Sequence, residues 1–442
     1  MVYEVILGRE ALEQEKYGTF GTILLGKHYV KMGAVTTLSQ PVYLDVNKSH
    51  VVFVCGKRGS GKSYCLGVIA EGISELPEVV RNRLSVILLD TMGIYWTMKY
   101  PNHKDEALLK EWGMEGKKID VKIYTPFGFF KKWKELGIPT DVAFALNPAE
   151  LSPEDWNLTF EIEITDPIAV FIERIILQMK KVHESYDIPD IINAIDEDKT
   201  ETLQVKQAAK NRFIAVEEWG VFSSNATPMK DLAQPGQVAI LDLSAYAIMP
   251  SGWRIKHLVV GLICNKLFRE RMKARKDEEY AAVHQAVHYI LEEHEEPKAS
   301  DMPICWLMID EAHEFIPNTG KTASSDALIT LLREGRQPGI ALVLATQQPG
   351  KIHTDAMTQS DVILAHRLTA KIDTDALGSL LQSYLRVGLD KELANLPRVP
   401  GACIAVDDVN ERLYPIRIRP RFSWHGGGAP GVITEVKKAF EF

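Results

Sequence analysis

Stretches of continuous apolar residues recur along the chain and predict the buried strands of an α/β fold. The first, residues 50–55, runs directly into a glycine-rich loop. Four more end in or beside a polar residue: Leu84–Asp90, Gln237–Leu243, Pro303–Asp310 and Gly339–Thr346. Segments with helical periodicity lie between them, notably Gly252–Lys276 and Asp326–Glu334. This alternation is typical of a mainly parallel sheet that is covered on both faces.

The polar residues at the strand ends predict where a ligand binds. The carboxyl ends of parallel strands lie at one edge of the sheet, and ligands bind at that edge. We therefore expect four strand-end residues to converge near the glycine loop, namely Asp90, Asp242, Asp310 and Thr346.

Two segments differ from this core. Residues 1–48 hold three short strand-like stretches separated by turn residues, which predict a short β-rich N-terminal segment resembling a truncated barrel: Thr22–Leu25, Tyr29–Met32 and Val42–Val46. Residues 97–236 are richer in helical patterns and too long for one crossover, so we expect a helical insertion subdomain. The core then comprises residues 49–96 and 237–420, and residues 421–442 form a C-terminal tail with a glycine-rich joint before a short amphipathic end, Val432–Phe442.

Composition narrows the class of protein. The 442 residues are 25% charged and 46% hydrophobic, as in folded proteins, and the net charge is -8. A surface that is acidic overall cannot be basic throughout, so DNA binding requires local positive charge, as in a pore built from several subunits. Five scattered cysteines, no signal pattern and no apolar run long enough to span a membrane predict a cytoplasmic protein.

The glycine-rich loop has the GxxxxGK[ST] pattern of a phosphate-binding loop. Phosphate oxygens need several backbone N–H donors at close range, and glycines let the chain wrap that tightly. Lys62 is expected to reach the β- and γ-phosphates of ATP, and Ser63 to hold Mg²⁺. A chance glycine turn is the alternative, and the strand before the loop and the helix after it argue against it. The expected nucleotide contacts are Gly56, Lys57, Arg58, Gly59, Ser60, Gly61, Lys62, Ser63 and Tyr64.

The pair Asp310-Glu311 supplies the second half of an ATP site. Asp310 ends an apolar strand and is expected to coordinate Mg²⁺ through water, while Glu311 orients and deprotonates the attacking water. Alone, two acids at a strand end are often a solvated helix start. A glutamate here favours hydrolysis over phosphotransfer to a second substrate, which disfavours a nucleotide kinase.

Residues around the predicted strand Gly339–Thr346 complete the set of candidate site residues. Gln347, at its tip, fits a sensor of the γ-phosphate. Arg333 and Arg336 precede the strand, and an arginine there can reach the nucleotide of a neighbouring subunit; an ordinary solvated helix end is the alternative. His313 fits either a contact with the sensor glutamine or a phosphate, or a structural hydrogen bond.

In combination these motifs resemble the HerA-like ATPases of the HerA/FtsK class. The match spans about residues 45–428 and continues through the segments Asp90–Tyr95, Val238–Ser244 and Arg417–Arg421. The resemblance implies a RecA-like core and a homohexameric ring that hydrolyses ATP and translocates double-stranded DNA. It makes Lys62 and Ser63 the nucleotide and Mg²⁺ ligands, Asp310 and Glu311 the metal and water pair, Gln347 the sensor, and Arg336 a finger acting in trans.

The resemblance also implies partner enzymes, and the chain departs from the family pattern in two places. Relatives work with a nuclease, NurA in archaeal DNA end resection, or with other effector enzymes in antiphage systems. In the family an Asp-x-x-Gly-Glu-Tyr pattern usually ends the second strand, whereas Ile94 stands here in place of the glutamate. The N-terminal barrel of the family needs about a hundred residues, more than precede this core.

DNA contacts in a ring are expected from loops that follow strand ends. Residues 316–322 and 350–354 each offer a lysine, Lys321 and Lys351, beside small polar residues suited to phosphate contacts; ordinary surface loops are the alternative. A different class of function is a ring scaffold whose nucleotide state switches an attached effector, with little translocation. An ABC-type transport ATPase is disfavoured because the chain has no LSGGQ-like segment between residues 63 and 310.

Overall fold

A single sheet runs through the protein, here seen in a computed structural model that describes residues 4–32, 35–288, 302–368, 370–378, 389, 392–393 and 395–428. Thirteen strands of the described residues form this sheet. In spatial order they are β1 (Val5–Leu7), β3 (Val35–Asp45), β2 (Thr22–Met32), β13 (Arg412–Ile418), β12 (Ala402–Asp407), β11 (Val362–His366), β4 (Val51–Cys55), β10 (Ile340–Thr346), β9 (Ile304–Ile309), β5 (Leu84–Asp90), β8 (Val238–Asp242), β6 (Val121–Pro126) and β7 (Val142–Phe144).

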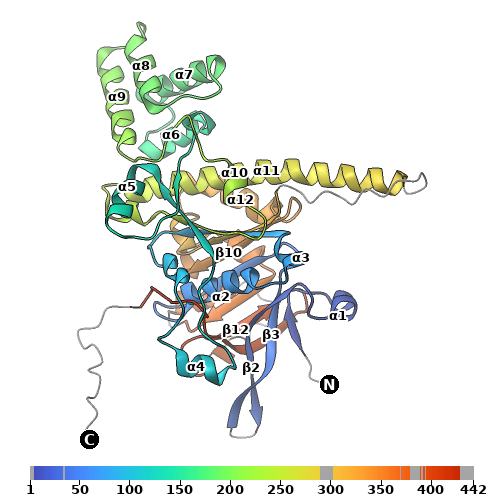
Figure 1. Ribbon diagram of the computed structural model, residues 1–442. Helices are drawn as coiled ribbons and strands as arrows, with labels where there is room; N and C mark the ends of the chain where they lie inside the picture. The colour runs from blue at the N-terminus through green and yellow to red at the C-terminus, as the bar shows by residue number, and fades with distance from the viewer. Residues whose placement is uncertain are drawn as a thin grey trace, which may run out of the picture.

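Helices cover both faces of the sheet and extend beyond it (Figure 1). They are α1 (Ala11–Tyr17), α2 (Lys62–Ser74), α3 (Glu78–Arg81), α4 (Glu106–Glu111), α5 (Phe127–Glu135), α6 (Pro153–Phe160), α7 (Pro167–Val182), α8 (Ile188–Glu197), α9 (Leu203–Glu217), α10 (Met229–Leu232), α11 (Gly252–His288), α12 (Ser325–Glu334), α13 (Asp355–Thr358) and α14 (Lys371–Gly378). Short 3-10 helices are η1 (Tyr95–Lys99), η2 (Pro148–Glu150), η3 (Ser244–Ile248), η4 (Ala312–Glu314) and η5 (Pro349–Lys351).

The parallel half of the sheet runs from β11 to β7, and its strands from β11 to β8 lie in the predicted core. The strands β4, β10, β5 and β8 are buried along their whole length, which explains their continuous apolar sequences. Alternate residues of β4 pack on opposite faces: Val52 and Val54 join the cluster that includes α2, whereas Val51 and Phe53 join the cluster that includes α11 and α12. The five strands predicted from apolar stretches are confirmed, with ends that differ by at most one residue at either side.

The N-terminal segment differs from the prediction because its strands are longer. Gly26, expected to separate two short strands, lies inside the eleven-residue β2. A Cβ at Gly26 would lie 2.1 Å from the carbonyl oxygen of Arg417, so this glycine permits close approach of β13. The predicted turn at Gly26 is therefore wrong. β1, β2 and β3 form the end of the main sheet, joined to it through β13.

Residues 97–236 differ from the prediction in their first part. Here β6 and β7 extend the main sheet beyond β8 in parallel, so the segment expected to form a helical insertion also contributes two strands to the sheet. Helices α6, α7, α8 and α9 then pack on one another and rise above α11, away from the sheet (Figure 1). The division of the chain into domains stays a prediction.

Helix α11 is longer than predicted, because the helix continues past Lys276 to His288. Its first half is buried at positions such as Leu258 and Ile263, whereas its polar second half extends away from the core (Figure 1). Despite this length, no helix of the described residues has the apolar stretch needed to cross a membrane.

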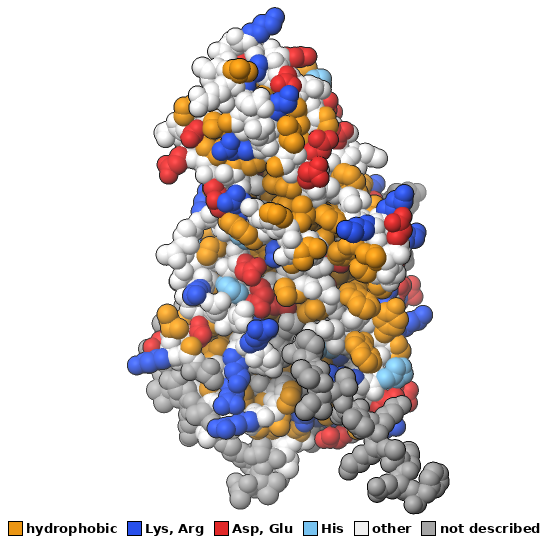
Figure 2. All heavy atoms as spheres, turned by 90° about the vertical axis from the view of Figure 1, so that its left-hand side faces the viewer, with side chains coloured by type: hydrophobic (Ala, Val, Ile, Leu, Met, Phe, Trp, Pro, Cys, Tyr) orange, Lys and Arg blue, Asp and Glu red, His pale blue; other side chains and the backbone are white. Residues whose placement is uncertain are grey.

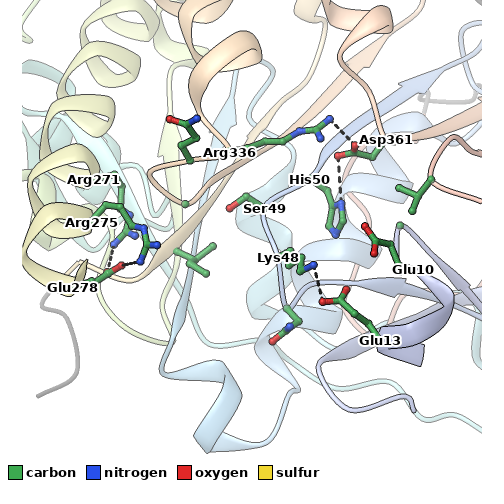
Figure 3. A pocket seen from close by; sticks show the side chains of 16 residues that line it. Glu10, Glu13, Lys48, Ser49, His50, Arg271, Arg275, Glu278, Arg336 and Asp361 are labelled. Atoms are coloured by element: carbon green, nitrogen blue, oxygen red, sulfur yellow. Dashed lines mark hydrogen bonds and ion pairs between the residues drawn. The ribbon is translucent and has the colours of Figure 1, made fainter. Parts of the chain in front are cut away.

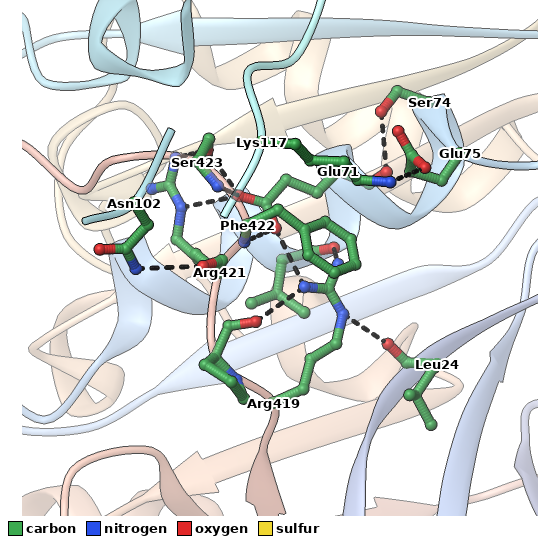
Figure 4. A network of polar contacts seen from close by, with 12 residues as sticks. Leu24, Glu71, Ser74, Glu75, Asn102, Lys117, Arg419, Arg421, Phe422 and Ser423 are labelled. Atoms are coloured by element: carbon green, nitrogen blue, oxygen red, sulfur yellow. Dashed lines mark hydrogen bonds and ion pairs between the residues drawn. The ribbon is translucent and has the colours of Figure 1, made fainter. Parts of the chain in front are cut away.

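The C-terminal segment crosses α2 and is held there by one buried carboxylate, Glu71 (Figure 4). Glu71 accepts hydrogen bonds from Arg419 at 3.0 Å and from Arg421 at 3.2 Å, and from the backbone N–H groups of Phe422 and Ser423. Burial alone raises the pKa of Glu71, but the two guanidinium groups more than offset it, so the pKa lies below its ordinary value. The predicted amphipathic end, Val432–Phe442, lies outside the described residues.

Candidate functional site

The phosphate-binding loop lies between β4 and the N-terminus of α2, as the sequence predicts. Gly59 and Gly61 have φ of 74° and 109°, a region that favours glycine. Among the described residues no side chain caps the N-terminus of α2, which leaves its first backbone N–H groups available to an anion. Lys62 is buried with its ammonium 3.3 Å from the carbonyl oxygen of Lys57, and Ser60 Oγ is buried without a partner among the described residues. These unsatisfied donors fit the phosphates of a nucleotide.

Not every predicted loop residue points its side chain toward this anion site. Lys57 and Arg58 are exposed. The Tyr64 hydroxyl accepts a hydrogen bond of 2.6 Å from the backbone N–H of Arg421, and its ring packs edge-on against His425. The side chain of Tyr64 therefore binds the C-terminal segment. The part of Tyr64 that could contact a nucleotide is its backbone.

Tyr95 joins the two predicted Mg²⁺ ligands. Its buried hydroxyl lies 3.2 Å from Oδ2 of Asp310 and 3.2 Å from the carbonyl oxygen of Ser63. Burial, with the charges of Asp310 and Asp90, raises the pKa of Tyr95, so this hydroxyl stays protonated and donates. Ser63 and Asp310 provide the hydroxyl and carboxylate oxygens that fit Mg²⁺. The sequence interpretation missed Tyr95, although the residue closes the segment Asp90–Tyr95.

Asp90 acts on the site through Tyr95. Its carboxylate accepts four backbone N–H groups from residues 92–95, including that of Tyr95 at 2.8 Å. Asp242, at the end of the neighbouring β8, accepts from the backbone of Ser244 instead. Burial and the neighbouring Asp242 charge raise the pKa of Asp90 to about 7. The four strand-end residues gather at one edge, and two of them, Asp90 and Asp242, shape the adjoining turns.

Glu311, the predicted base, has one carboxylate oxygen that is buried and unbonded among the described residues. This oxygen is Oε2, and the backbone of Glu311 is left-handed, with φ of 52°. Burial, with the charge of Asp310 beside it, raises the pKa of Glu311 to about 7, and the Lys62 ammonium opposes this shift. A carboxylate with this pKa and a free oxygen suits a general base near neutral pH.

His313 contacts Gln348 rather than the predicted sensor Gln347. The amide nitrogen of Gln348 lies 3.2 Å from Nε2 of His313, and Nδ1 of His313 lies 3.1 Å from Oγ1 of Thr346. An amide N–H donates, so Nε2 accepts and Nδ1–H donates to Thr346, which describes a neutral imidazole. Burial lowers the pKa of His313, which favours the same neutral form. Gln347 lies beside Glu311, and its backbone N–H group acts to lower the pKa of Glu311.

Arg336 lies at the opposite edge of the sheet from the phosphate loop. It precedes β10, whose seven residues span about 20 Å before Thr346. Its guanidinium forms an ion pair of 2.5 Å with Asp361 and donates to the carbonyl oxygen of Gln359, and Figure 3 shows it beside a cavity of about 460 Å³. Asp361 also accepts from His50 and from the backbone N–H of Val51, the first residue of β4. Arg336 cannot serve the nucleotide site of its own chain.

The two predicted DNA-contacting lysines differ in their surroundings. Lys321 is paired with Asp326 at 2.7 Å and with Glu154 at 3.2 Å. Lys351 is exposed and makes no ion pair with any residue that the structure describes. The charge of Lys321 is thus already paired with carboxylates, whereas the charge of Lys351 is available to the phosphates of DNA.

Comparisons with known proteins agree with this geometry. The sequence model of a family described as the central domain of the helicase HerA matches residues 30–270, more than half of the chain. A probable DNA double-strand break repair helicase HerA of Methanocaldococcus jannaschii is 23% identical over 399 residues, covering 83% of this chain and 73% of that relative.

Among solved structures, VirB4 shows the same fold. VirB4 of Thermoanaerobacter pseudethanolicus has a TM-score of 0.54 at 13% identity, with 90% of this chain and 96% of that one covered. The bacterial conjugative coupling protein TrwB has a TM-score of 0.48 at 12% identity, with 92% and 95% covered. The expected α/β, RecA-like core with a mainly parallel sheet is confirmed by the sheet order and by the likeness to VirB4.

Proposed function

The chain belongs to the family of the helicase HerA central domain, and from this premise we propose that it is an ATP-hydrolysing ring motor that translocates double-stranded DNA. The observation that carries the proposal is the tie between the two halves of the site. The Tyr95 hydroxyl lies 3.2 Å from both the carbonyl oxygen of Ser63 and Oδ2 of Asp310, so its one proton is shared between them or donated to either, while Glu311 follows Asp310 directly. The phosphate loop, the metal ligands and the base are thereby held at one edge of the sheet.

The chemistry follows from these residues. The phosphate loop and Lys62 bind the phosphates, and Ser63 and Asp310 are suited to hold Mg²⁺. Mg²⁺, when bound, neutralises charge on the phosphoryl oxygens. Glu311 orients a water molecule and takes its proton, and Gln347, beside Glu311, is placed to sense the γ-phosphate.

A ring is proposed because Arg336, the arginine expected to act on the phosphates, lies far from the site of its own chain. Arg336 lies about 20 Å from its own phosphate loop, so its use as a finger needs a second copy. Exposed apolar side chains follow the ends of β5 and β8, with Met92 63% and Ile248 90% exposed. Figure 2 shows further hydrophobic side chains gathered across the middle of one face. Such surface suits subunit contact, and we propose a homohexamer.

Duplex DNA is the proposed substrate because the relative from Methanocaldococcus jannaschii carries the name of a DNA double-strand break repair helicase. We propose DNA end processing with a NurA-like nuclease, or antiphage defence with another effector enzyme, as the setting.

A nucleotide-switched ring scaffold is the second candidate. One observation favours it: the ion pairs of Lys321 with Asp326 and Glu154 already neutralise one of the two lysines offered to DNA. A scaffold of this kind needs no grip on phosphates, so it predicts no duplex binding even at low salt.

The experiment that separates these functions measures ATP hydrolysis by the full chain with and without duplex DNA. A motor is expected to hydrolyse ATP faster when duplex is present, and Glu311→Gln is expected to abolish hydrolysis in both conditions. Hydrolysis that never responds to duplex, together with no duplex binding at low salt, would support the scaffold and contradict the motor.

A further inference from the structure

The two loops that follow β9 and β10 are hydrogen-bonded to each other. The backbone N–H of Asn318 donates to the carbonyl oxygen of Lys351, and that of His353 donates to Ile316, each at 2.9 Å. Pro317 and Ile352 form an antiparallel bridge between these contacts. The amide of Asn318 adds a bond of 2.9 Å to the carbonyl oxygen of Gly350. We call residues 316–322 and 349–354 together the paired loops.

One side of the paired loops is fixed in the core and the other is open to solvent. Ile316 and Ile352 are buried, whereas Asn318, Thr319 and Lys351 are exposed. Backbone bonds between the loops make them respond to a ligand as one unit. Amide, hydroxyl and ammonium groups on the open side suit the phosphates of a nucleic acid backbone, which they contact without reading sequence.

The paired loops reach the carboxylate of Glu311 through two residues, Gln348 and His313. Gln348 immediately precedes η5, the first turn of the second loop, and its side chain donates to His313. Nδ1 of His313 lies 3.6 Å from Oε2 of Glu311. Thr346 closes the cluster, because its hydroxyl accepts from both His313 and the backbone of Gln348.

Glu311 is built to respond to a small movement of this imidazole. Its Oε2 has no hydrogen-bond partner among the described residues, so hydrogen bonds do not fix that oxygen. Its left-handed backbone, with φ of 52°, is a conformation that costs a non-glycine residue free energy and is held by its surroundings. A shift of His313 therefore changes the position of Glu311 more readily than it would for a fully bonded carboxylate.

We propose that Gln348 and His313 are positioning residues that couple duplex DNA on the paired loops to Glu311. Backbone phosphates on Lys351 and Asn318 displace the paired loops as one unit, Gln348 carries this displacement to His313, and His313 sets Glu311 for proton transfer. The inference rests on the proposed function, since it requires that the chain binds duplex DNA.

The test compares Gln348→Ala with wild type in three measurements: ATP hydrolysis without DNA, its stimulation by saturating duplex, and duplex affinity by fluorescence anisotropy. Gln348→Ala is expected to keep the basal rate, the KM for ATP and the duplex affinity, and to reduce the stimulation about fivefold or more. His313→Asn is the second relay variant and is expected to lose stimulation too. Gln207→Ala, an exposed glutamine on α9, is the matched control and keeps full stimulation.

Lys351→Ala separates binding from coupling. It is expected to weaken duplex affinity and lower the salt dependence of binding by about one charge, while stimulation at saturating duplex stays close to wild type. Full stimulation of Gln348→Ala would overturn the relay and leave the motor intact. Loss of basal hydrolysis in Gln348→Ala would also overturn it, because the residue would then serve hydrolysis itself. A wild-type chain that binds no duplex would overturn the proposed function and the relay together.

Discussion

The hydroxyl of Tyr95 lies 3.2 Å from Oδ2 of Asp310 and links the end of β9 to the phosphate loop. Removing this hydroxyl leaves the ring packing in place but releases the Asp310 carboxylate. We expect Tyr95→Phe to lower kcat about tenfold, the effect of one buried hydrogen bond to a charged group, and to raise the Mg²⁺ concentration needed for half-maximal activity. Steady-state hydrolysis during Mg²⁺ titration measures both.

The matched control for this prediction is Tyr100→Phe, in which a half-exposed hydroxyl just after η1 is lost. It is expected to behave as wild type. An unchanged Mg²⁺ dependence in Tyr95→Phe would show that the hydroxyl does not position Asp310.

The raised pKa of Glu311 gives the hydrolysis reaction a pH dependence. A general base acts in its deprotonated form, and burial beside Asp310 raises the pKa of Glu311 to about 7. The base form is therefore lost as the pH falls through this value. We expect kcat/KM, which reports the free enzyme, to fall about tenfold per pH unit below about pH 7 and to level off above it.

The exposed Glu314 offers a check on the cause of this shift. Its charge contributes to the raised pKa of Glu311, so Glu314→Gln is expected to move the pH profile of kcat/KM slightly toward lower pH. If Glu311 is the base, the midpoint of the pH profile lies near 7. A kcat/KM that is level from pH 6 to 8 would therefore contradict the assignment of Glu311 as the base.

The buried carboxylate Glu71 predicts a large effect on stability. Glu71→Gln leaves Arg419 and Arg421 buried without a compensating charge, and breaking a buried pair in this way costs about 3 kcal/mol. We expect a clear drop in Tm by calorimetry, whereas the exposed control Glu78→Gln on α3 is expected to change little.

The pH dependence of stability distinguishes an ion pair from simple packing. The folded-state pKa of Glu71 lies below its ordinary value of 4.5, so its contribution is present above that value and is lost as the pH falls. Glu71→Gln is thus expected to reduce the acid-induced loss of stability. Equal acid sensitivity in both proteins would show that the charge contributes nothing.

The core strands and the phosphate loop were predictable because their signals are local. An apolar run such as Val51–Cys55 is buried on both faces, and the glycine loop has fixed spacing. The strands β1, β6, β7, β11, β12 and β13 were missed; β13 is only partly buried, and β6 and β7 lie inside a segment dominated by helical patterns. The predicted end of α11 was too early because the second half of the helix is mostly polar and lacks a continuous apolar face.

The contacts that the sequence did not predict are those between residues distant in sequence. Arg336 meets Asp361, and Glu71 meets Arg419, only through the fold. The contact of His313 with Gln348 instead of Gln347 depends on the backbone after β10, where Gln348 has φ of -129° and ψ of 69°. That conformation departs from strand geometry, so side-chain alternation does not predict which glutamine faces the histidine.

The central claim is that each hydrolytic site takes Glu311 from one subunit and Arg336 from the next. Arg336→Ala alone is expected to lower hydrolysis about a thousandfold with ATP binding retained. Arg333→Ala is the matched control, because it also removes an exposed guanidinium from an ion pair with an aspartate, Asp355, and it is expected to keep most activity.

The most direct measurement is hydrolysis by mixed rings that contain Arg336→Ala and Glu311→Gln subunits, made by co-expression with two different tags. Each variant alone is inactive, whereas in equal mixtures about one quarter of the interfaces join an intact Glu311 to an intact Arg336. The account predicts recovery of hydrolysis to about that fraction of the wild-type rate. Mixed rings that stay as inactive as either variant, or Arg336→Ala rings that hydrolyse ATP as wild type does, would contradict it.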